Sequence, residues 1–175
     1  LRTRIASELV DTVGFDAIRG NVSELKALAL GSATTRGVDA SAADAVTDAR
    51  LDEMVSFSKG YAREVGGIVA ITGAIDLVAD EETCYVIRNG RAEMGRVTGT
   101  GCMLSGVLCA YLIANPKDKL EAAAAAVCLM GLAGEVGWSR MQEGDGNATY
   151  RNRIIDAIYN IDGEQLDREA CYELR

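Results

Sequence analysis

Residues 66–80 have the sequence GGIVAITGAIDLVAD, and this stretch decides the fold of the chain. The β-branched run at 68–71 predicts a central strand that is buried on both faces. Thr72 and Gly73 end that strand, and residues 75–79 predict a second strand paired with it, followed by an acidic turn. Two successive strands therefore form the middle of a sheet, around which the other elements are arranged.

On the N-terminal side of this stretch, helical and strand patterns alternate. Apolar residues recur at helical spacing in the helices and fill the short strands. Gly66 and Gly67 end the helix that precedes the central strand. The expected order is an amphipathic helix at 1–13, a strand at 15–18, an exit turn at 19–21, a helix capped by Asn21 or Ser23, a loop at 31–43 and a helix at 42–65.

On the C-terminal side, Asn89-Gly90 is a hairpin signal between expected strands at 84–87 and 92–94. The other expected elements are apolar helices at 103–113 and 120–141, a turn at 144–147, a last helix that includes 154–158 and a polar tail from 163. Strands that alternate with helices predict an α/β protein with a mostly parallel central sheet. A length of 175 residues suits one domain spanning 1–175.

The composition excludes several classes of function. A net charge of −8 opposes binding to nucleic acid and to anionic membranes. The chain has no His, which removes the Ser/His and Cys/His dyads and the commonest metal ligand. Its five cysteines contain no CxxC pair, so reduced thiols in a cytoplasmic protein fit better than disulfides or a zinc site. The longest apolar run, at 122–133, is too short to span a bilayer, and no signal peptide is visible.

The sequence VTGTGC at 97–102 is the main candidate for chemistry. Gly99 and Gly101 allow backbone N–H groups to converge at the start of a helix, whose dipole adds positive potential. Such an anion hole would bind the phosphoryl group that a nucleotide transfers. The side chain of Cys102 could reach the same place as a proton acceptor. The structural alternative is a glycine-rich turn that only starts a helix, with Cys102 as a core residue.

Thr72 and Arg19 each follow a predicted strand, at the kind of sheet edge where α/β proteins bind ligands. The threonine hydroxyl could contact a phosphate, and arginine offers it a bidentate grip. Glu24 could hold a water molecule on Mg²⁺. The alternatives are an ordinary strand-end turn, a surface arginine, and a glutamate favoured by the helix dipole.

Two further groups of residues have simpler interpretations. The glycines of the second apolar helix permit close approach of another backbone or of an adenine ring, and packing is the simpler role; they are Gly131, Gly134 and Gly137. Asp76 and Asp80 flank the second strand of the opening stretch, and we interpret the acidic turn after it as solvated.

Several motifs in a fixed order carry a resemblance to a known family. They are IRGNVSE at 18–24, RGVDA at 36–40, VAITGAID at 69–76, VTGTGC at 97–102, AAAAVCLMGLAGE at 123–135 and GDGN at 144–147. In this order the chain resembles the hydroxyethylthiazole kinases of the ribokinase-like superfamily, over almost its whole length. The resemblance implies a three-layer α/β/α sandwich. It also implies phosphorylation of the hydroxyl of 4-methyl-5-(2-hydroxyethyl)thiazole by ATP with Mg²⁺, a step of thiamine salvage.

The resemblance also implies roles for single residues. Arg19, Thr72 and Gly101 match positions that contact ATP, and Gly99 matches a contact with the thiazole. Glu24 matches the acidic residue near Mg²⁺. Cys102 matches the catalytic position, where most ribokinase-like enzymes have Asp.

The sequence departs from the family's pattern at its front. Members begin with further α/β units and a DPVG-like acidic motif, so we expect these N-terminal units to be missing from the chain. GDGN resembles the family's GPGS-like turn only loosely. The family further implies a cytoplasmic homotrimer whose subunits share the substrate pocket.

Two other functions stay open at this point. One is a ligand-binding or assembly domain that kept the fold and lost the chemistry, which a thermal shift by nucleotide and Mg²⁺ would distinguish. The missing N-terminal units favour such a domain, whereas the set of Arg19, Glu24, Thr72 and GTGC at 99–102 favours the kinase. The other is a different ribokinase-like enzyme, such as a pyrimidine or sugar kinase, against which Cys102 in place of Asp argues.

Overall fold

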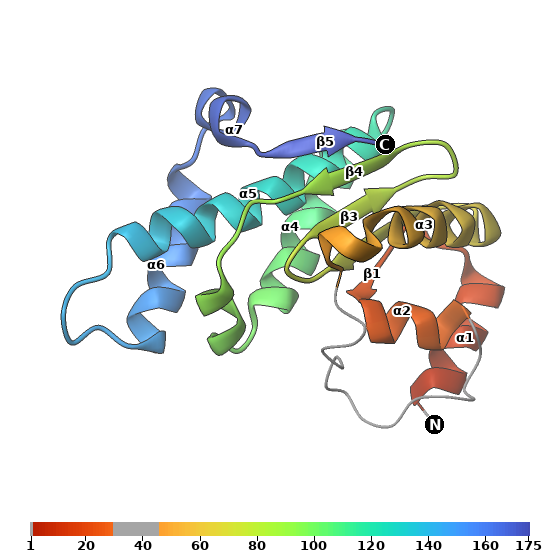
Figure 1. Ribbon diagram of the computed structural model, residues 1–175, viewed down its shortest axis with the longest axis horizontal. Helices are drawn as coiled ribbons and strands as arrows, with labels where there is room; N and C mark the ends of the chain where they lie inside the picture. Colours follow the sequence, from red (N-terminus) through yellow and green to blue (C-terminus); the bar gives the residue numbers. More distant parts are fainter. Residues whose placement is uncertain (1, 30–45) are drawn as a thin grey trace. The chain divides into compact units, whose positions relative to one another are not determined.

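The computed structural model describes residues 2–29 and 46–175 (Figure 1). The chain divides into two compact units, one of Leu1–Val86 with Leu174–Arg175, and one of Ile87–Glu173. Each is described by itself below. The single domain expected at 1–175 stays a prediction, because two compact units can belong to one domain. The loop expected at 31–43 and the motif RGVDA lie outside the described residues.

The first unit holds most of the sheet. Its elements are α1 (Arg2–Val13), β1 (Ala17–Asn21), α2 (Val22–Ala29), the 3₁₀ turn η2 (Asp48–Arg50), α3 (Leu51–Val65), β2 (Ile68–Thr72), β3 (Asp76–Ala79) and β4 (Cys84–Ile87). β5 (Tyr172–Leu174), at the end of the chain, completes the strand order β1-β2-β3-β4-β5. The expected helix at 1–13 and the central strand are thus confirmed, and the helix expected from 42 begins at Leu51 within the described residues.

The sheet is mixed rather than mostly parallel, because β2 has one parallel and one antiparallel neighbour. β1 runs parallel to β2, with Ala17 opposite Ile68 and Asn21 opposite Thr72. β3 runs antiparallel to β2, because residues 73–75 are too few for the crossover that a parallel pair needs. The α/β class that alternating strands and helices predict is confirmed, since α2 and α3 lie between β1 and β2 along the chain.

β1 begins and ends later than the sequence predicts. Arg19, Gly20 and Asn21 belong to the strand and not to an exit turn, because they pair in register with Ala70–Thr72. Gly20 is buried, and a Cβ atom there would lie 3.2 Å from side-chain atoms of Glu24 and Leu25. Glycine at this position therefore lets α2 pack closely on the strand from which it emerges.

The cap of α2 is Asn21 and not Ser23. The Asn21 Oδ1 atom accepts a hydrogen bond of 2.8 Å from the Glu24 N–H, and the Glu24 Oε2 atom accepts one of 2.8 Å from the Asn21 N–H. This reciprocal pair is a capping box, which satisfies two N–H groups that a helix start otherwise leaves without acceptors.

The core of the first unit consists of aliphatic side chains between the sheet and helices α2 and α3. Leu25, Met54 and Leu77 have no exposed surface, and the burial of each contributes about 1.5–3 kcal/mol. Gly66 ends α3 with a φ of +66°, as expected for a glycine in the left-handed region. The residues of α1 at helical spacing are exposed by 45, 45 and 61%; they are Ile5, Leu9 and Val13.

The second unit is mainly helical. Its elements are the 3₁₀ helix η3 (Ala92–Arg96), α4 (Thr100–Ala114), α5 (Lys119–Ser139), α6 (Asn147–Asn160) and α7 (Gly163–Glu169). α7 lies in the tail for which the sequence predicted only polar residues. Asp162 caps it, since the Asp162 Oδ1 atom accepts a hydrogen bond of 2.8 Å from the Gln165 N–H.

The expected hairpin at Asn89-Gly90 is wrong, since residues 92–96 form η3. The hairpin joins β3 to β4, where Asp80 Oδ1 accepts hydrogen bonds from the N–H groups of Glu82 (2.9 Å) and Thr83 (2.6 Å). Asn89 is buried instead, and its Oδ1 atom accepts a hydrogen bond of 2.7 Å from the Cys171 N–H. The backbone of Glu169 and Cys171 thus binds the side-chain amide of Asn89, which a turn would have exposed to solvent.

α5 is the buried centre of the second unit, and its glycines have a packing role. A Cβ atom on Gly131 would lie 2.7 Å from the backbone of Asn89, and one on Gly137 would lie 3.1 Å from the backbone N of Ile154. A Cβ atom on Gly134 would overlap the Met94 sulfur. These glycines therefore accept the close approach of backbone and of one side chain, as the simpler interpretation held.

Among the helices that the structure describes, α5 alone is long and apolar enough to cross a membrane. The helix expected at 120–141 is confirmed as α5, whose 21 residues extend beyond the apolar run at 122–133 on both sides. In this protein 72% of its apolar window is buried, as in the core helix of a folded domain.

Candidate functional site

The structure brings Arg19 and Thr72 together. Arg19 Nη1 lies 3.4 Å from Thr72 Oγ1, to which it donates a hydrogen bond, and the Thr72 hydroxyl donates one of 3.5 Å to the Gly20 carbonyl. Both side chains are half-buried. A guanidinium and a hydroxyl thus share one small region at the end of two strands.

Parallel pairing is the reason for this proximity. β1 and β2 both end, in the direction of the chain, at the same edge of the sheet, where Asn21 lies opposite Thr72. The carboxyl edge of parallel strands is where open α/β sheets bind ligands. Both hydrogen bonds are at the long end of the range, so an anionic ligand could replace them at little cost.

Glu24 lies at the start of α2, and its side chain is exposed. One of its carboxylate oxygens already accepts the Asn21 N–H of the capping box. Within residues 2–29 and 46–175 no group of three or more His, Cys, Asp or Glu side chains could hold a metal ion. A single exposed carboxylate fits the outer shell of a hydrated Mg²⁺, which keeps several waters and binds through few protein ligands.

Asp76 is a polar residue of this region that the sequence did not single out as functional. It is half-buried at the start of β3, and its Oδ1 atom accepts a hydrogen bond of 2.8 Å from the Gly73 N–H. Burial raises the pKa of its carboxyl to about 7, against the opposing effects of the Gly73 hydrogen bond and the Arg19 charge. An Asp shortly after a strand-ending glycine is a turn signal that could have pointed to it.

In the second unit, VTGTGC forms the start of α4. The helix begins at Thr100, and the N–H of Met103 makes a bond of 2.9 Å to the Gly99 carbonyl. The amides of Thr100, Gly101 and Cys102 precede that bond and belong to the first turn, where N–H groups have no acceptor within the helix. Gly99 caps the helix with a φ of +100°, which favours glycine strongly.

This helix start has the properties of an anion site. Three backbone N–H groups and the positive end of the helix dipole are directed toward the same place. The thiol of Cys102 is exposed at that end. The thiol of Cys84, by contrast, is buried, and burial raises its pKa to about 12, which makes it inert.

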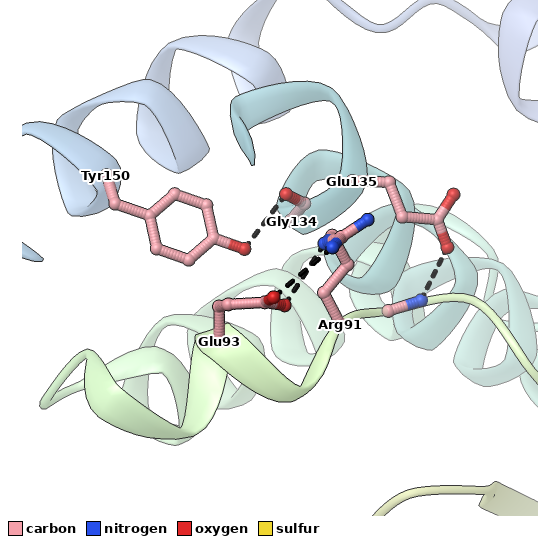
Figure 2. A network of polar contacts seen from close by, with 6 residues as sticks. Arg91, Glu93, Gly134, Glu135 and Tyr150 are labelled. Carbon is pink, nitrogen blue, oxygen red and sulfur yellow. Dashed lines mark hydrogen bonds and ion pairs between the residues drawn. The ribbon is translucent and has the colours of Figure 1, made fainter. Parts of the chain in front are cut away.

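A network of polar contacts holds the segment that leads to this helix start (Figure 2). The Glu135 carboxylate accepts a hydrogen bond of 2.6 Å from the Gly90 N–H, and Arg91 forms a bidentate pair with Glu93 at 3.1 and 3.2 Å. The Tyr150 hydroxyl donates a hydrogen bond of 2.9 Å to the Gly134 carbonyl. Burial raises the pKa of Tyr150 to about 12, so it remains a donor.

Asn147, the last residue of the GDGN stretch and the first of α6, binds the same segment. Its Nδ2 atom donates a hydrogen bond of 3.1 Å to the Arg96 carbonyl, directly ahead of VTGTGC. The sequence pointed to Gly134 and to GDGN but not to these contacts, because most of them link positions far apart in the chain.

Comparisons with known proteins agree in pointing to one family. The model of the Hydroxyethylthiazole kinase family matches residues 1–164. The Hydroxyethylthiazole kinase of Clostridium acetobutylicum is 50% identical over 173 residues, which are 99% of this chain and 63% of that protein. Hydroxyethylthiazole kinase 2 of Clostridium botulinum strain Langeland is 34% identical over 161 residues, 92% of this chain and 58% of that protein. The chain thus spans about three fifths of the length of these relatives.

Solved structures support the same assignment. The hydroxyethylthiazole kinase protein of Pyrococcus horikoshii OT3 superposes with a TM-score of 0.79 at 26% identity, over 99% of this chain and 60% of that one. The YxkO protein of Bacillus subtilis, at 14% identity and a TM-score of 0.56 over 81% of this chain and 47% of that one, shares the fold alone. The fold is ribokinase-like, and the chain belongs to the hydroxyethylthiazole kinase family.

Proposed function

We propose that this protein transfers the γ-phosphoryl group of ATP to the hydroxyl of 4-methyl-5-(2-hydroxyethyl)thiazole, a step of thiamine salvage. The observation that carries the proposal is the contact of Arg19 with Thr72 at the carboxyl edge of β1 and β2, in a chain of this family. A guanidinium and a hydroxyl at such an edge are groups that bind phosphate.

Positioning is the main task of such an enzyme. Phosphoryl transfer passes through a state whose negative charge is spread over the equatorial oxygens. Arg19 would bind a phosphate of ATP in a bidentate manner, and Thr72 would donate its hydroxyl hydrogen to another oxygen. The amide of Gly101, in the first turn of α4, would bind the transferred phosphoryl group, as helix N-termini bind anions.

Cys102 is the proposed catalytic residue. Its side chain is exposed at the start of α4, where the thiolate form could accept the proton that the alcohol loses as the new O–P bond forms and the bond from the γ-phosphorus to ADP breaks. Gly99 would contact the thiazole, because a residue without a side chain lets the ring approach the backbone. A weak acceptor is sufficient, since positioning and charge neutralisation lower most of the barrier.

Glu24 is the proposed residue for Mg²⁺. Its carboxylate would accept hydrogen bonds from waters of the hydrated ion, in keeping with its exposure, while one of its oxygens keeps the Asn21 N–H of the capping box. The ion would neutralise charge on the β- and γ-phosphates. We also propose that the protein is a cytoplasmic homotrimer, as its resemblance to the family implies.

A coupled assay of ADP release tests the proposed function. With ATP, Mg²⁺ and the thiazole alcohol we expect turnover, and with pyrimidine or sugar alcohols we expect at least about tenfold lower kcat/KM, because a site that binds a thiazole ring does not match the shape and polar groups of those alcohols. Arg19→Ala and Thr72→Val should raise KM for ATP through lost phosphate contacts. Normal kinetics in both variants, or equal use of a sugar, would refute the proposal.

A further inference from the structure

Asp76 is a half-buried carboxylate of the first unit that the proposed mechanism does not use. Its Oδ1 atom accepts a hydrogen bond of 2.8 Å from the Gly73 N–H. Gly73 directly follows Thr72, the last residue of β2. The bond therefore closes the turn at 73–76 next to the hydroxyl that we assign to phosphate binding.

The first two residues of this turn have few neighbours, whereas its third, Ile75, is buried in the core. Gly73 and Ala74 are exposed, and a Cβ atom on Gly73 would meet only the Ile75 carbonyl, at 3.6 Å. Glycine is also the residue with the greatest backbone freedom. The carboxylate of Asp76 thus helps to set the direction in which the chain leaves Thr72.

The same carboxyl group lies within the electrostatic reach of Arg19. The Arg19 charge lowers its pKa, while burial raises it. A carboxylate beside a phosphate-binding guanidinium repels a bound phosphate. The useful property of Asp76 is consequently its acceptor oxygen and not its charge.

We propose that Asp76 is a positioning residue of the nucleotide site: by binding the Gly73 N–H it fixes the end of β2 and directs the Thr72 hydroxyl toward Arg19. This inference rests on the proposed function, in which Arg19 and Thr72 contact the phosphates of ATP. Asp76 itself touches no substrate in this account.

Asp80 provides a matched control. It stands at the other end of β3, and its Oδ1 atom accepts hydrogen bonds from the N–H groups of Glu82 and Thr83. It therefore also holds a turn through its carboxylate, although it stands at the start of that turn, away from Thr72 along the strand. A general loss of sheet stability would affect both positions, whereas a positioning role is confined to Asp76.

The test is the dissociation constant of MgATP, measured by titration calorimetry for the full chain and three variants. For Asp76→Ala we expect binding weaker by about five- to tenfold, the effect of one lost hydrogen bond. Asp76→Asn should bind within about twofold of the unchanged chain, or more tightly, because Asn keeps an acceptor and removes the negative charge. Asp80→Ala should bind MgATP as the unchanged chain does.

Each other result overturns the inference. If Asp76→Ala binds MgATP normally, the turn does not position the site. If Asp76→Asn is as weak as Asp76→Ala, the acceptor is not what matters, and if Asp80→Ala is equally weak, the effect is general destabilisation. If the unchanged chain itself does not bind MgATP, the proposed function fails, and the positioning role fails with it.

Discussion

At the scale of single residues, Thr72 connects the sheet to the proposed chemistry. Its hydroxyl receives a hydrogen bond from Arg19 and donates one to Gly20, at 3.4 and 3.5 Å. Bonds of this length are weak, so the hydroxyl and the guanidinium can turn to a phosphate with little loss. The sequence predicts both residues at this edge, but only Thr72 ends its strand, whereas Arg19 lies within β1 and reaches Thr72 with its side chain.

Cys102 gives a direct test of the chemical step. Cys102→Asp should keep or raise kcat, because a carboxylate is a better proton acceptor, whereas Cys102→Leu should lower kcat by about 10²-fold. The measurement is steady-state ADP release with the thiazole alcohol. Cys109→Ala, an exposed cysteine on the same helix, serves as the control. Equal turnover in all of these proteins would remove Cys102 from the mechanism.

Asp76 makes stability depend on pH. Its carboxyl has a pKa of about 7 in the folded protein against an ordinary value of 3.8, so the folded state binds the extra proton between those values. This contribution is fully present below pH 3.8 and is lost as pH rises through about 7. Asp76→Asn should lack that decline and gain about 1–2 kcal/mol on the unchanged chain by pH 8, a value reduced for partial exposure.

Chemical denaturation at a series of pH values measures this difference. Asp80→Asn controls for the loss of one negative charge near β3. A free-energy difference between Asp76→Asn and the unchanged chain that stays constant from pH 4 to pH 8 would contradict the burial of an ionisable carboxyl at this position.

At the scale of elements, variants at the start of α2 can distinguish a structural role of Glu24, as a helix cap, from a functional role in binding Mg²⁺. Glu24→Gln keeps the capping box, because glutamine accepts the same Asn21 N–H, so the free energy of unfolding should change by less than about 0.5 kcal/mol. Glu24→Ala should lose about 1 kcal/mol. If Glu24 also serves Mg²⁺, both variants should need more Mg²⁺ for ATP use, by about tenfold. Normal Mg²⁺ dependence in Glu24→Gln would leave Glu24 as a cap only.

The glycines of α5 predict a graded effect on stability. Gly131→Ala should destabilise by about 1–3 kcal/mol, because the new methyl group meets the rigid backbone of Asn89. Gly134→Ala should cost less, because the end of the flexible Met94 side chain can move. Gly106→Ala in α4 meets nothing within 4 Å and should stabilise by about 0.5–1 kcal/mol.

Thermal and urea unfolding rank these variants. A cost for Gly131→Ala no larger than for Gly134→Ala would contradict the packing of α5 against the Asn89 backbone. Destabilisation by Gly106→Ala would show that α4 packs more closely than its exposed glycine indicates.

Sequence reasoning located elements better than it located contacts. β2, β3 and β4 follow from runs of β-branched and aliphatic residues, and Gly66 from its place after a helix. The hairpin at Asn89-Gly90 failed, because long-range partners bind Asn89 and override the local turn signal. In the site, Thr72 could be predicted from the end of its strand and Asp76 from a turn signal, whereas the reach of Arg19 from within β1 and the network around Glu135 depend on the folded geometry.

At the scale of the whole molecule, the family is established and the activity is a proposal. The chain matches 99% of its own length to the Clostridium acetobutylicum enzyme, and 63% of that enzyme's length. Each compact unit contributes its own candidate groups: Arg19 and Thr72 in the first, and the amides at the start of α4 in the second. The central claim is that Arg19 and Thr72, at the carboxyl edge of β1 and β2, bind the phosphates of ATP.

Nuclear magnetic resonance tests that claim most directly, by titrating the labelled chain with MgATP and following the Thr72 amide and the Arg19 side chain. The account predicts that both signals shift with one common dissociation constant, while the amide signal of Asp80 stays in place. A shift of only one of these two signals, or no saturable shift at all, would contradict it.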